Sequence, residues 1–228
     1  MHERPQVALL HALRDLGYRI DSENDKLPVT IHGNCAKGGS CEVDITESSQ
    51  SASALLLGSK LGKWQIDIKG ERGAESPYVA MTSDLIEAFP SGGGRMTIEP
   101  DASSGSYFWA AGHILAADGG KPVAVTRWPE TDWQIDANFP SMLPLTGELS
   151  RQNDLGDSIM TAITIAPLAI RPVRFTELGR LRLQECERVM ALRNGLAQCG
   201  ATVIENGDTC LLYTSDAADE GLGVDLGG

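Results

Sequence analysis

Apolar residues recur along the chain at two spacings, one typical of helices and one typical of strands. In residues 5–16 they stand three or four apart, which predicts an amphipathic helix, and Gly17 follows where a left-handed residue commonly ends a helix. The next residues, 18–20, have an extended pattern. The same order of helix, glycine and strand returns at 187–204 and again at 77–98. The pattern therefore predicts a helix–strand unit that is weakly repeated.

Further strands and helices are predicted between these units. The segments with the alternating pattern of strands are 29–32, 42–45, 65–69, 123–127 and 173–176. The segments with helical spacing are 49–60, 103–117 and 157–169. The last two are apolar around most of their circumference, which is typical of buried helices. Prolines and a glycine in 138–155 predict a loop there.

This mixture predicts an α/β protein in which buried helices have strands outside them, the inverse of a doubly wound sheet. The glycine-rich segment 92–100 marks a boundary, so we expect one lobe over 1–99 and a second over 100–209. We expect residues 210–228 to be a non-native tail, because they resemble a translated sequencing adapter. The abrupt start before the first helix leads us to expect a chain that is cut at both ends.

Composition narrows the classes of function. The chain has 228 residues and a net charge of −12, with 42% hydrophobic and 22% charged residues, which is ordinary for a globular protein. Such an acidic chain lacks the basic surface that nucleic-acid binding needs. No apolar run approaches the length of a membrane helix, and no secretory signal follows Met1. We therefore expect a cytoplasmic protein that binds neither nucleic acid nor membrane.

The cysteines and histidines do not predict a metal site. The chain has 5 cysteines and 4 histidines, but they are scattered, and structural zinc sites need closely spaced pairs of ligands. Unpaired, reduced thiols fit a cytoplasmic protein better. We expect no metal and no cofactor.

Several polar groups stand where predicted helices begin. Ser48, Ser49 and Gln50 precede an apolar helix, so they could bind an anion or simply cap the helix. Asp157 and Asp101 have the same two interpretations. Glu185 and Arg188 share a helix face, either as a surface ion pair of little energetic value or as an acid–base group beside an anion-binding arginine. Arg4, at the first helix, offers a second arginine of that kind.

A series of short motifs, taken in order, resembles the 5-enolpyruvylshikimate-3-phosphate synthase family of the shikimate pathway. The motifs are Glu3-Arg4-Pro5, Gly38-Gly39, Ser48-Ser49-Gln50, Ser76-Pro77-Tyr78, residues 101–108, residues 156–161, and Glu185-Cys186-Glu187-Arg188. The resemblance runs from about residue 1 to residue 209 and covers roughly the middle half of a family member. It implies a two-lobed enolpyruvyl-transferase-like fold of repeated βαβ-type units with buried helices, incomplete at both ends.

The resemblance also implies a reaction. The enolpyruvyl group of phosphoenolpyruvate would move to the 5-hydroxyl of shikimate 3-phosphate, and phosphate would leave. Asp157 would take the proton from the attacking hydroxyl, and Glu185 would handle the proton at the methylene carbon. The resemblance assigns shikimate 3-phosphate to Ser48, Ser49, Gln50 and Tyr78, and phosphoenolpyruvate to Arg4 and Arg188. These two small molecules are the expected partners of a protein that is monomeric at full length.

The sequence departs from the family pattern at several points. Gln184 stands where lysine is common, so it would contribute a hydrogen bond to the substrate but no charge. The alignment slips by one residue before Tyr78, so the serine usual there corresponds to Glu75, to Ser76 or to neither. The lysine and Asn-Ala-Gly segments found upstream in the family, and the His-Arg pair and lysine found downstream, are not in this chain. We therefore expect the 228-residue chain alone to be inactive.

Two other functions remain open on the sequence. One is the related transfer of the enolpyruvyl group to UDP-N-acetylglucosamine, which shares the fold and the position of Asp157. The other is a non-catalytic module that binds anions at its helix ends.

Overall fold

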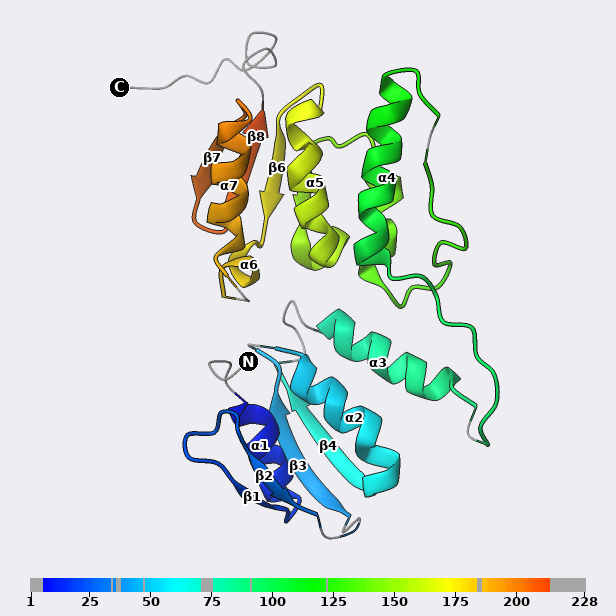
Figure 1. Cartoon of the computed structure of the whole chain (residues 1–228), viewed down its shortest axis with the longest axis vertical. Coiled ribbons are helices and arrows are strands. Elements are labelled where there is room, and N and C mark those ends of the chain that lie inside the picture. Colours follow the sequence, from blue (N-terminus) through cyan, green and yellow to red (C-terminus); the bar gives the residue numbers. More distant parts are fainter. Residues whose placement is uncertain are drawn as a thin grey trace. The chain divides into compact units, whose positions relative to one another are not determined.

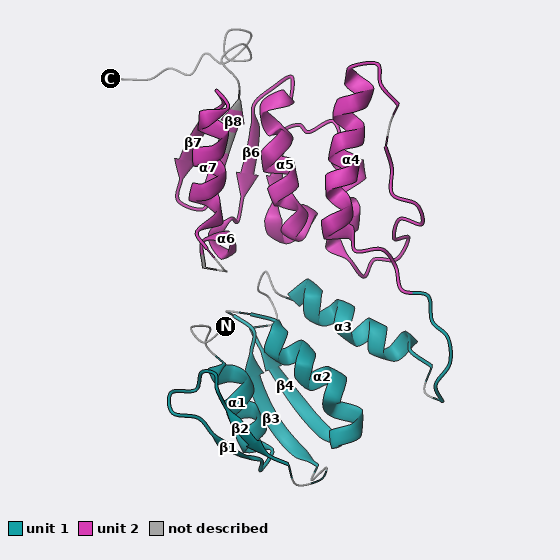
Figure 2. Ribbon diagram, viewed as in Figure 1, with its two compact units in different colours: residues 1–97 teal, residues 98–228 magenta. Residues whose placement is uncertain are grey.

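The computed structural model describes residues 6–33, 35, 38–46, 48–70, 76–90, 92–121, 123–183 and 186–213. The chain divides into two compact units, residues 1–97 and 98–228 (Figure 2). The division falls close to the boundary predicted after residue 99. Each unit has a core of its own, and we describe the two in turn.

Unit 1 is a small α/β unit in which helices pack on short sheets (Figure 1). Its elements are α1 (Val7–Asp15), β1 (Arg19–Asp21), β2 (Thr30–His32), β3 (Gly39–Asp44), α2 (Gln50–Gly62), β4 (Trp64–Lys69) and α3 (Ser76–Ala88). Strands β1 and β2 pair antiparallel, whereas β3 and β4 pair parallel. Because α2 connects the two parallel strands, β3, α2 and β4 form a βαβ unit.

Alternation along β3 builds the core of unit 1. Cys41 and Val43 are buried, and the residues beside them on the strand are exposed, so one face of the sheet packs against α1 and α2. Leu55 of α2 is completely buried in this cluster. The end of α2 requires glycine, because a Cβ on Gly62 would lie 2.1 Å from the ring of Trp64. The predicted helix–strand pattern thus forms a packed layer here.

Unit 2 contains a four-stranded sheet with helices packed against it. Its elements are α4 (Ala102–Ala117), η1 (Ile135–Met142), β5 (Glu148–Ser150), η2 (Arg151–Leu155), η3 (Gly156–Ser158), α5 (Ile159–Ile165), η4 (Ala166–Leu168), β6 (Val173–Thr176), α6 (Gly179–Leu183), α7 (Arg188–Gln198), β7 (Thr202–Asn206) and β8 (Thr209–Tyr213). The strand order is β5-β6-β8-β7. Strand β5 runs parallel to β6, and the other neighbours are antiparallel.

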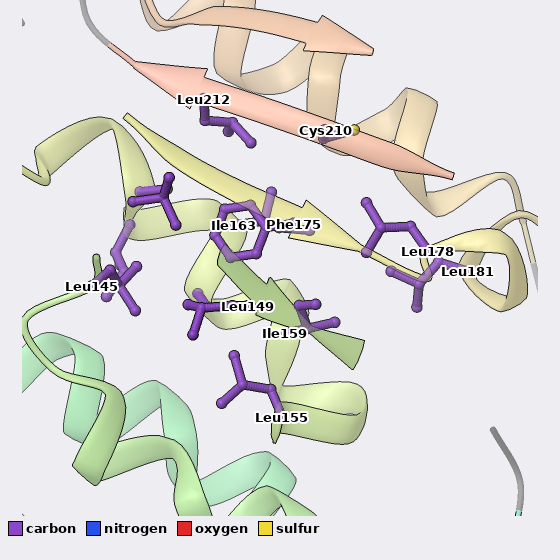
Figure 3. Close-up of a cluster of buried hydrophobic side chains, with 14 of the residues drawn as sticks. Leu145, Leu149, Leu155, Ile159, Ile163, Phe175, Leu178, Leu181, Cys210 and Leu212 are labelled. Atoms are coloured by element: carbon purple, nitrogen blue, oxygen red, sulfur yellow. The ribbon is translucent and has the colours of Figure 1, made fainter. Parts of the chain in front are cut away.

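Helix α5 lies in the middle of unit 2 and is buried, as its apolar sequence predicted. Ile159 and Ile163 pack with Phe175 of β6 and Leu212 of β8 (Figure 3). Burial of side chains of this size stabilises a fold by roughly 1.5–3 kcal/mol each. Packing in this core therefore fixes the position of α5 and of the residues that directly precede it.

The apolar segment 103–117 was also predicted to be a buried helix, and for this segment, which forms α4, the prediction was wrong. Its small residues, such as Ala102 and Gly105, are buried where α4 contacts η1, η3 and α5. Tyr107 and Phe108 are 59% and 57% exposed. The apolar composition of a helix does not show which of its faces pack against other elements. The pattern alone therefore overestimated how many side chains of α4 are buried.

Other sequence predictions also needed correction. Residues 96–98 and 123–127 are not strands, because no neighbouring strand pairs with them among the described residues. The predicted loop 138–155 contains the end of η1, then β5 and η2. The second lobe was predicted to end at residue 209, but Cys210 and Leu212 are buried in β8. Hydrogen bonding to β6 and β7 includes this segment in the sheet.

Candidate functional site

Asp157 stands on a tightly folded segment that leads into α5. Ser150 caps the N-terminus of one π-helical turn, η2, and its Oγ accepts a hydrogen bond from the backbone N of Asn153 at 3.0 Å. The turn ends at Gly156, with φ 55° and ψ −133°, a conformation that side chains other than glycine's rarely permit. Asp157 then lies in the short turn η3, directly before α5. This segment presents the Asp157 side chain at the start of a buried helix.

A buried arginine holds the carboxylate of Asp157. Nη2 of Arg151 donates to Oδ1 of Asp157 at 2.8 Å. The Arg151 side chain is 1% exposed, whereas that of Asp157 is 32% exposed. The carboxylate therefore stays accessible to solvent or a ligand while its partner is fixed inside the unit.

A second buried residue, Asp136 of η1, fixes the backbone beside Asp157. Oδ1 of Asp136 accepts a hydrogen bond from the backbone N of Ser158 at 2.6 Å. Burial raises the pKa of Asp136 to about 6; the hydrogen bonds from Ser158 lower it, and the negative charge of Asp157 raises it further. The backbone between η3 and α5 is thus anchored by a carboxyl group on a neighbouring segment.

Arg188 approaches the same end of α5. It opens α7, whose N-terminus is capped by Glu187, and Glu187 in turn pairs with Arg182. Nη1 of Arg188 lies 4.0 Å from the sulfur of Met160. Met160 follows Asp157 by three residues, a spacing that places both side chains on one side of a helical segment. Arg188 thus contacts the first turn of the helix that directly follows Asp157.

The candidate residues of unit 1 gather where two helices begin. Ser48 Oγ accepts from the backbone N of Gln50 at 3.3 Å, whereas Ser49, at the N-cap, makes no capping bond with its side chain. Tyr78 lies in the first turn of α3.

Ser53 and Thr82, one turn further along each helix, are joined by a 2.9 Å hydrogen bond. Figure 1 shows both helices starting at the same end of this pair. The start of α2 also favours anions, because unsatisfied N–H groups and the helix dipole point there.

Arg4, Gln184 and Glu185 lie outside the described residues. The sequence did not single out Arg151 or Asp136. Arg151 fell within the predicted loop, and its only signal was a charged residue six positions before Asp157. Nothing in the sequence distinguished Asp136 from other acidic loop residues, since its burial depends on tertiary packing.

No metal or membrane feature accompanies these residues in the described part of the chain. Among the described residues, no three His, Cys, Asp or Glu side chains gather in a way that could hold a metal ion. In the same part of the chain, no helix has the length and apolarity needed to span a bilayer. An open hollow over β3 and β4 is lined by Asp15, Glu42 and Asp67, among others. It contains none of the predicted site residues.

Comparison with solved structures identifies the fold. The structure of EPSP synthase from Acinetobacter baumannii, at 2.37 Å, matches this chain with a TM-score of 0.53 and 15% sequence identity. The match covers 94% of this chain and 57% of that one. The α/β fold class with an enolpyruvyl-transferase-like architecture is therefore confirmed.

Sequence comparison identifies the family. The family model described as EPSP synthase (3-phosphoshikimate 1-carboxyvinyltransferase) matches residues 1–154. The 3-phosphoshikimate 1-carboxyvinyltransferase of Pseudomonas savastanoi pv. phaseolicola is 32% identical over 242 residues, which cover 95% of this chain and 57% of that relative. That of Opitutus terrae is 31% identical over 237 residues, covering 90% and 54%. The chain belongs to the EPSP synthase family. It spans little more than half the length of these curated relatives.

Proposed function

We propose that the protein transfers the enolpyruvyl group of phosphoenolpyruvate to the 5-hydroxyl of shikimate 3-phosphate and releases phosphate. The observation that carries this proposal is the accessible carboxylate of Asp157, which buried Arg151 holds directly before α5. Arg188 contacts Met160, three residues further along. Membership of the EPSP synthase family supports the same reaction. The names of the relatives favour this acceptor over UDP-N-acetylglucosamine.

In this proposal Asp157 is the general base. Its carboxylate accepts the proton of the 5-hydroxyl while the hydroxyl oxygen forms a bond to the central carbon of phosphoenolpyruvate. The double-bond electrons take up a proton at the methylene carbon, which Glu185 delivers. The tetrahedral intermediate then loses phosphate as the same carbon gives a proton back, and the double bond re-forms. A positioned acid and base contribute typically 10²–10⁴-fold in rate to such steps.

The remaining residues bind two multiply charged substrates. Arg188 and Arg4 suit the carboxylate and phosphate of phosphoenolpyruvate, because the planar guanidinium donates two parallel hydrogen bonds. Gln184 adds a hydrogen bond without a charge. The polar start of α2, together with Tyr78, suits the phosphate and hydroxyls of shikimate 3-phosphate. This arrangement is supported by the shared end at which α2 and α3 begin.

Calorimetry and a phosphate-release assay test this function on the full product of the gene. We expect heat of binding with shikimate 3-phosphate and none with UDP-N-acetylglucosamine. We expect phosphate release only when phosphoenolpyruvate and shikimate 3-phosphate are both present. Binding of shikimate 3-phosphate without turnover would favour a non-catalytic anion-binding module. Absence of binding would rule out the proposed acceptor.

Three further expectations stay predictions. The full-length protein is predicted to be a monomer, to act in the cytoplasm, and to need no cofactor. The 228-residue chain by itself is predicted to show no turnover, and phosphate release by this chain would contradict that.

A further inference from the structure

Arg151 is the largest of the fully buried side chains in the described part of the protein. Moving a guanidinium out of water costs a large desolvation free energy, which its partners repay only with good geometry. One of these contacts is the 2.8 Å bond from Nη2 to Oδ1 of Asp157. An apolar side chain would fill the same space without that cost, so the presence of arginine here calls for an explanation other than packing.

The fold around Arg151 is built to hold it in one place. Ser150, the preceding residue, donates its backbone N–H to Oδ2 of Asp154 at 2.7 Å and caps the π-helical turn with its hydroxyl. Asn138 of η1 donates to the backbone O of Asp154 at 3.3 Å. The turn is thereby joined to η1. These hydrogen bonds fix the backbone from which the Arg151 side chain extends to Asp157.

Asp157 is therefore held at two points. Arg151 binds one oxygen of its side chain, and Asp136 binds the backbone N–H of the next residue, Ser158. Both anchoring groups are almost completely buried, whereas the carboxylate they hold is partly exposed. A surface ion pair would have two mobile, solvated partners. Here only the carboxylate reaches solvent.

We propose that Arg151 is a positioning residue, which fixes the Asp157 carboxylate so that Oδ1 is occupied and Oδ2 receives the proton of the attacking hydroxyl. This inference rests on the proposed function, in which Asp157 is the base. A misplacement of about 1 Å at a reacting group can cost about 10²-fold in rate. Arg151 does not touch substrate, so its loss acts on the rate of the chemical step rather than on substrate affinity.

The test is a mutant cycle on the full gene product. In Arg151→Met we expect kcat to fall by roughly 10–100-fold, with the KM values of both substrates nearly unchanged. Arg151→Lys keeps the charge but not the fork of donors, so it should retain part of the lost rate. Arg174→Met is the matched control. Arg174 is an exposed arginine of the same unit, whose contact with Glu148 is 3.8 Å long, and its replacement should leave kcat unchanged.

The same cycle separates positioning from a purely structural role. In the Asp157→Ala background, Arg151→Met should reduce kcat no further, because the residue acts only through Asp157. A further loss of the same factor in that background would overturn the inference. So would an unchanged kcat in both Arg151 variants while Asp157→Ala is strongly impaired. If Arg151→Met does not fold, as circular dichroism would reveal, Arg151→Lys takes its place in the cycle.

Failure of the proposed function gives a different result. If Asp157→Ala keeps the full rate, Asp157 is not the base, and both proposals fall together. If Asp157→Ala loses rate and the Arg151 variants do not, only the positioning role of Arg151 is wrong.

Discussion

The two units hold their candidate site residues in different ways. In unit 2, Asp157 is held from both sides by groups that are themselves buried, namely Arg151 and Asp136. In unit 1, the polar residues stand at the starts of α2 and α3, and Gln50 is exposed. A residue that binds a phosphate can tolerate such exposure, since the ligand supplies the partner. A proton acceptor must already be in place before the substrate arrives.

This comparison predicts unequal costs for substitutions in the two units. The buried charges of unit 2 make its site sensitive to the loss of any one partner. Gln50, exposed at the start of α2, can lose its side chain with little effect on stability. The stability predictions below use the 228-residue chain and run from the largest expected effect to the smallest.

Asp157→Ala should destabilise the chain by about 3–5 kcal/mol, because it removes the carboxylate that the buried Arg151 binds at 2.8 Å. Adding Arg151→Met should restore much of this loss, since the buried charge is then gone. The free energy of unfolding in urea measures both variants. A double variant no more stable than Asp157→Ala would show that the buried charge is not the source of the cost.

Asp136→Asn should alter how stability depends on pH. Burial raises the pKa of Asp136 to about 6 in the folded chain, from a usual value of 3.8. Below the lower value the carboxyl is protonated in both states. Between 3.8 and about 6 the unfolded chain is ionised at this position while the folded chain still holds the proton, so stability falls as pH rises through the folded pKa. Above that pKa the loss is complete. Relative to Asp136→Asn, the wild-type chain should lose about 2–3 kcal/mol between pH 4 and pH 7.

Denaturation series at several pH values check this dependence. Ser141→Ala replaces one uncharged side chain by another at an exposed position of η1. It controls for the pH dependence of the rest of the chain. A difference between wild type and Asp136→Asn that stays constant with pH would contradict the assignment.

Gly156→Ala should cost about 1–2 kcal/mol, because an alanine is strained at the positive φ of this residue. The same change should slow turnover in the full gene product, since it shifts the segment that carries Asp157. Gly195→Ala is a control within a helix of the same unit. An added Cβ there meets nothing within 4 Å, and the change should be neutral or slightly stabilising. Equal stability of the two variants would indicate that the turn at Gly156 is not required.

The smallest expected difference between the units is the stability lost when the side chain that caps a helix is removed. Asp101 accepts from the backbone N of Ser104 at 3.0 Å and from its hydroxyl at 2.8 Å, so Asp101→Ala should cost about 1 kcal/mol. Ser48 makes one longer bond at the start of α2, so Ser48→Ala should cost less, about 0.5 kcal/mol. Thermal unfolding compares them directly. A larger loss for Ser48→Ala would mean that its main role is to cap the helix.

Local patterns predicted much of the fold. The leucines of α1 and Gly17, and the alternation at Cys41 and Val43, are short-range signals that tertiary packing did not override. Residues 123–127 have a strand-like sequence but find no partner strand in the described chain. Strand pairing depends on residues far away in the sequence, and so a local pattern cannot establish it.

The candidate site was predicted only where its residues carry motifs. Asp157 and Arg188 stand at helix starts, which a sequence can mark. Arg151 and Asp136 act through burial and through contacts formed only in the folded unit. Their sequence neighbourhood is that of a loop. A charged residue in a loop is usually solvated, and only the structure shows that these two are not.

A single-turnover experiment tests the central assignment, the proton acceptor role of Asp157, most directly. The full gene product carrying Asp157→Ala is mixed with both substrates, and the formation of product is followed while the affinity for shikimate 3-phosphate is measured separately. We predict that the rate falls by roughly 10²–10⁴-fold and that the affinity changes little. An undiminished rate, or a loss explained entirely by weaker binding of shikimate 3-phosphate, would contradict the account.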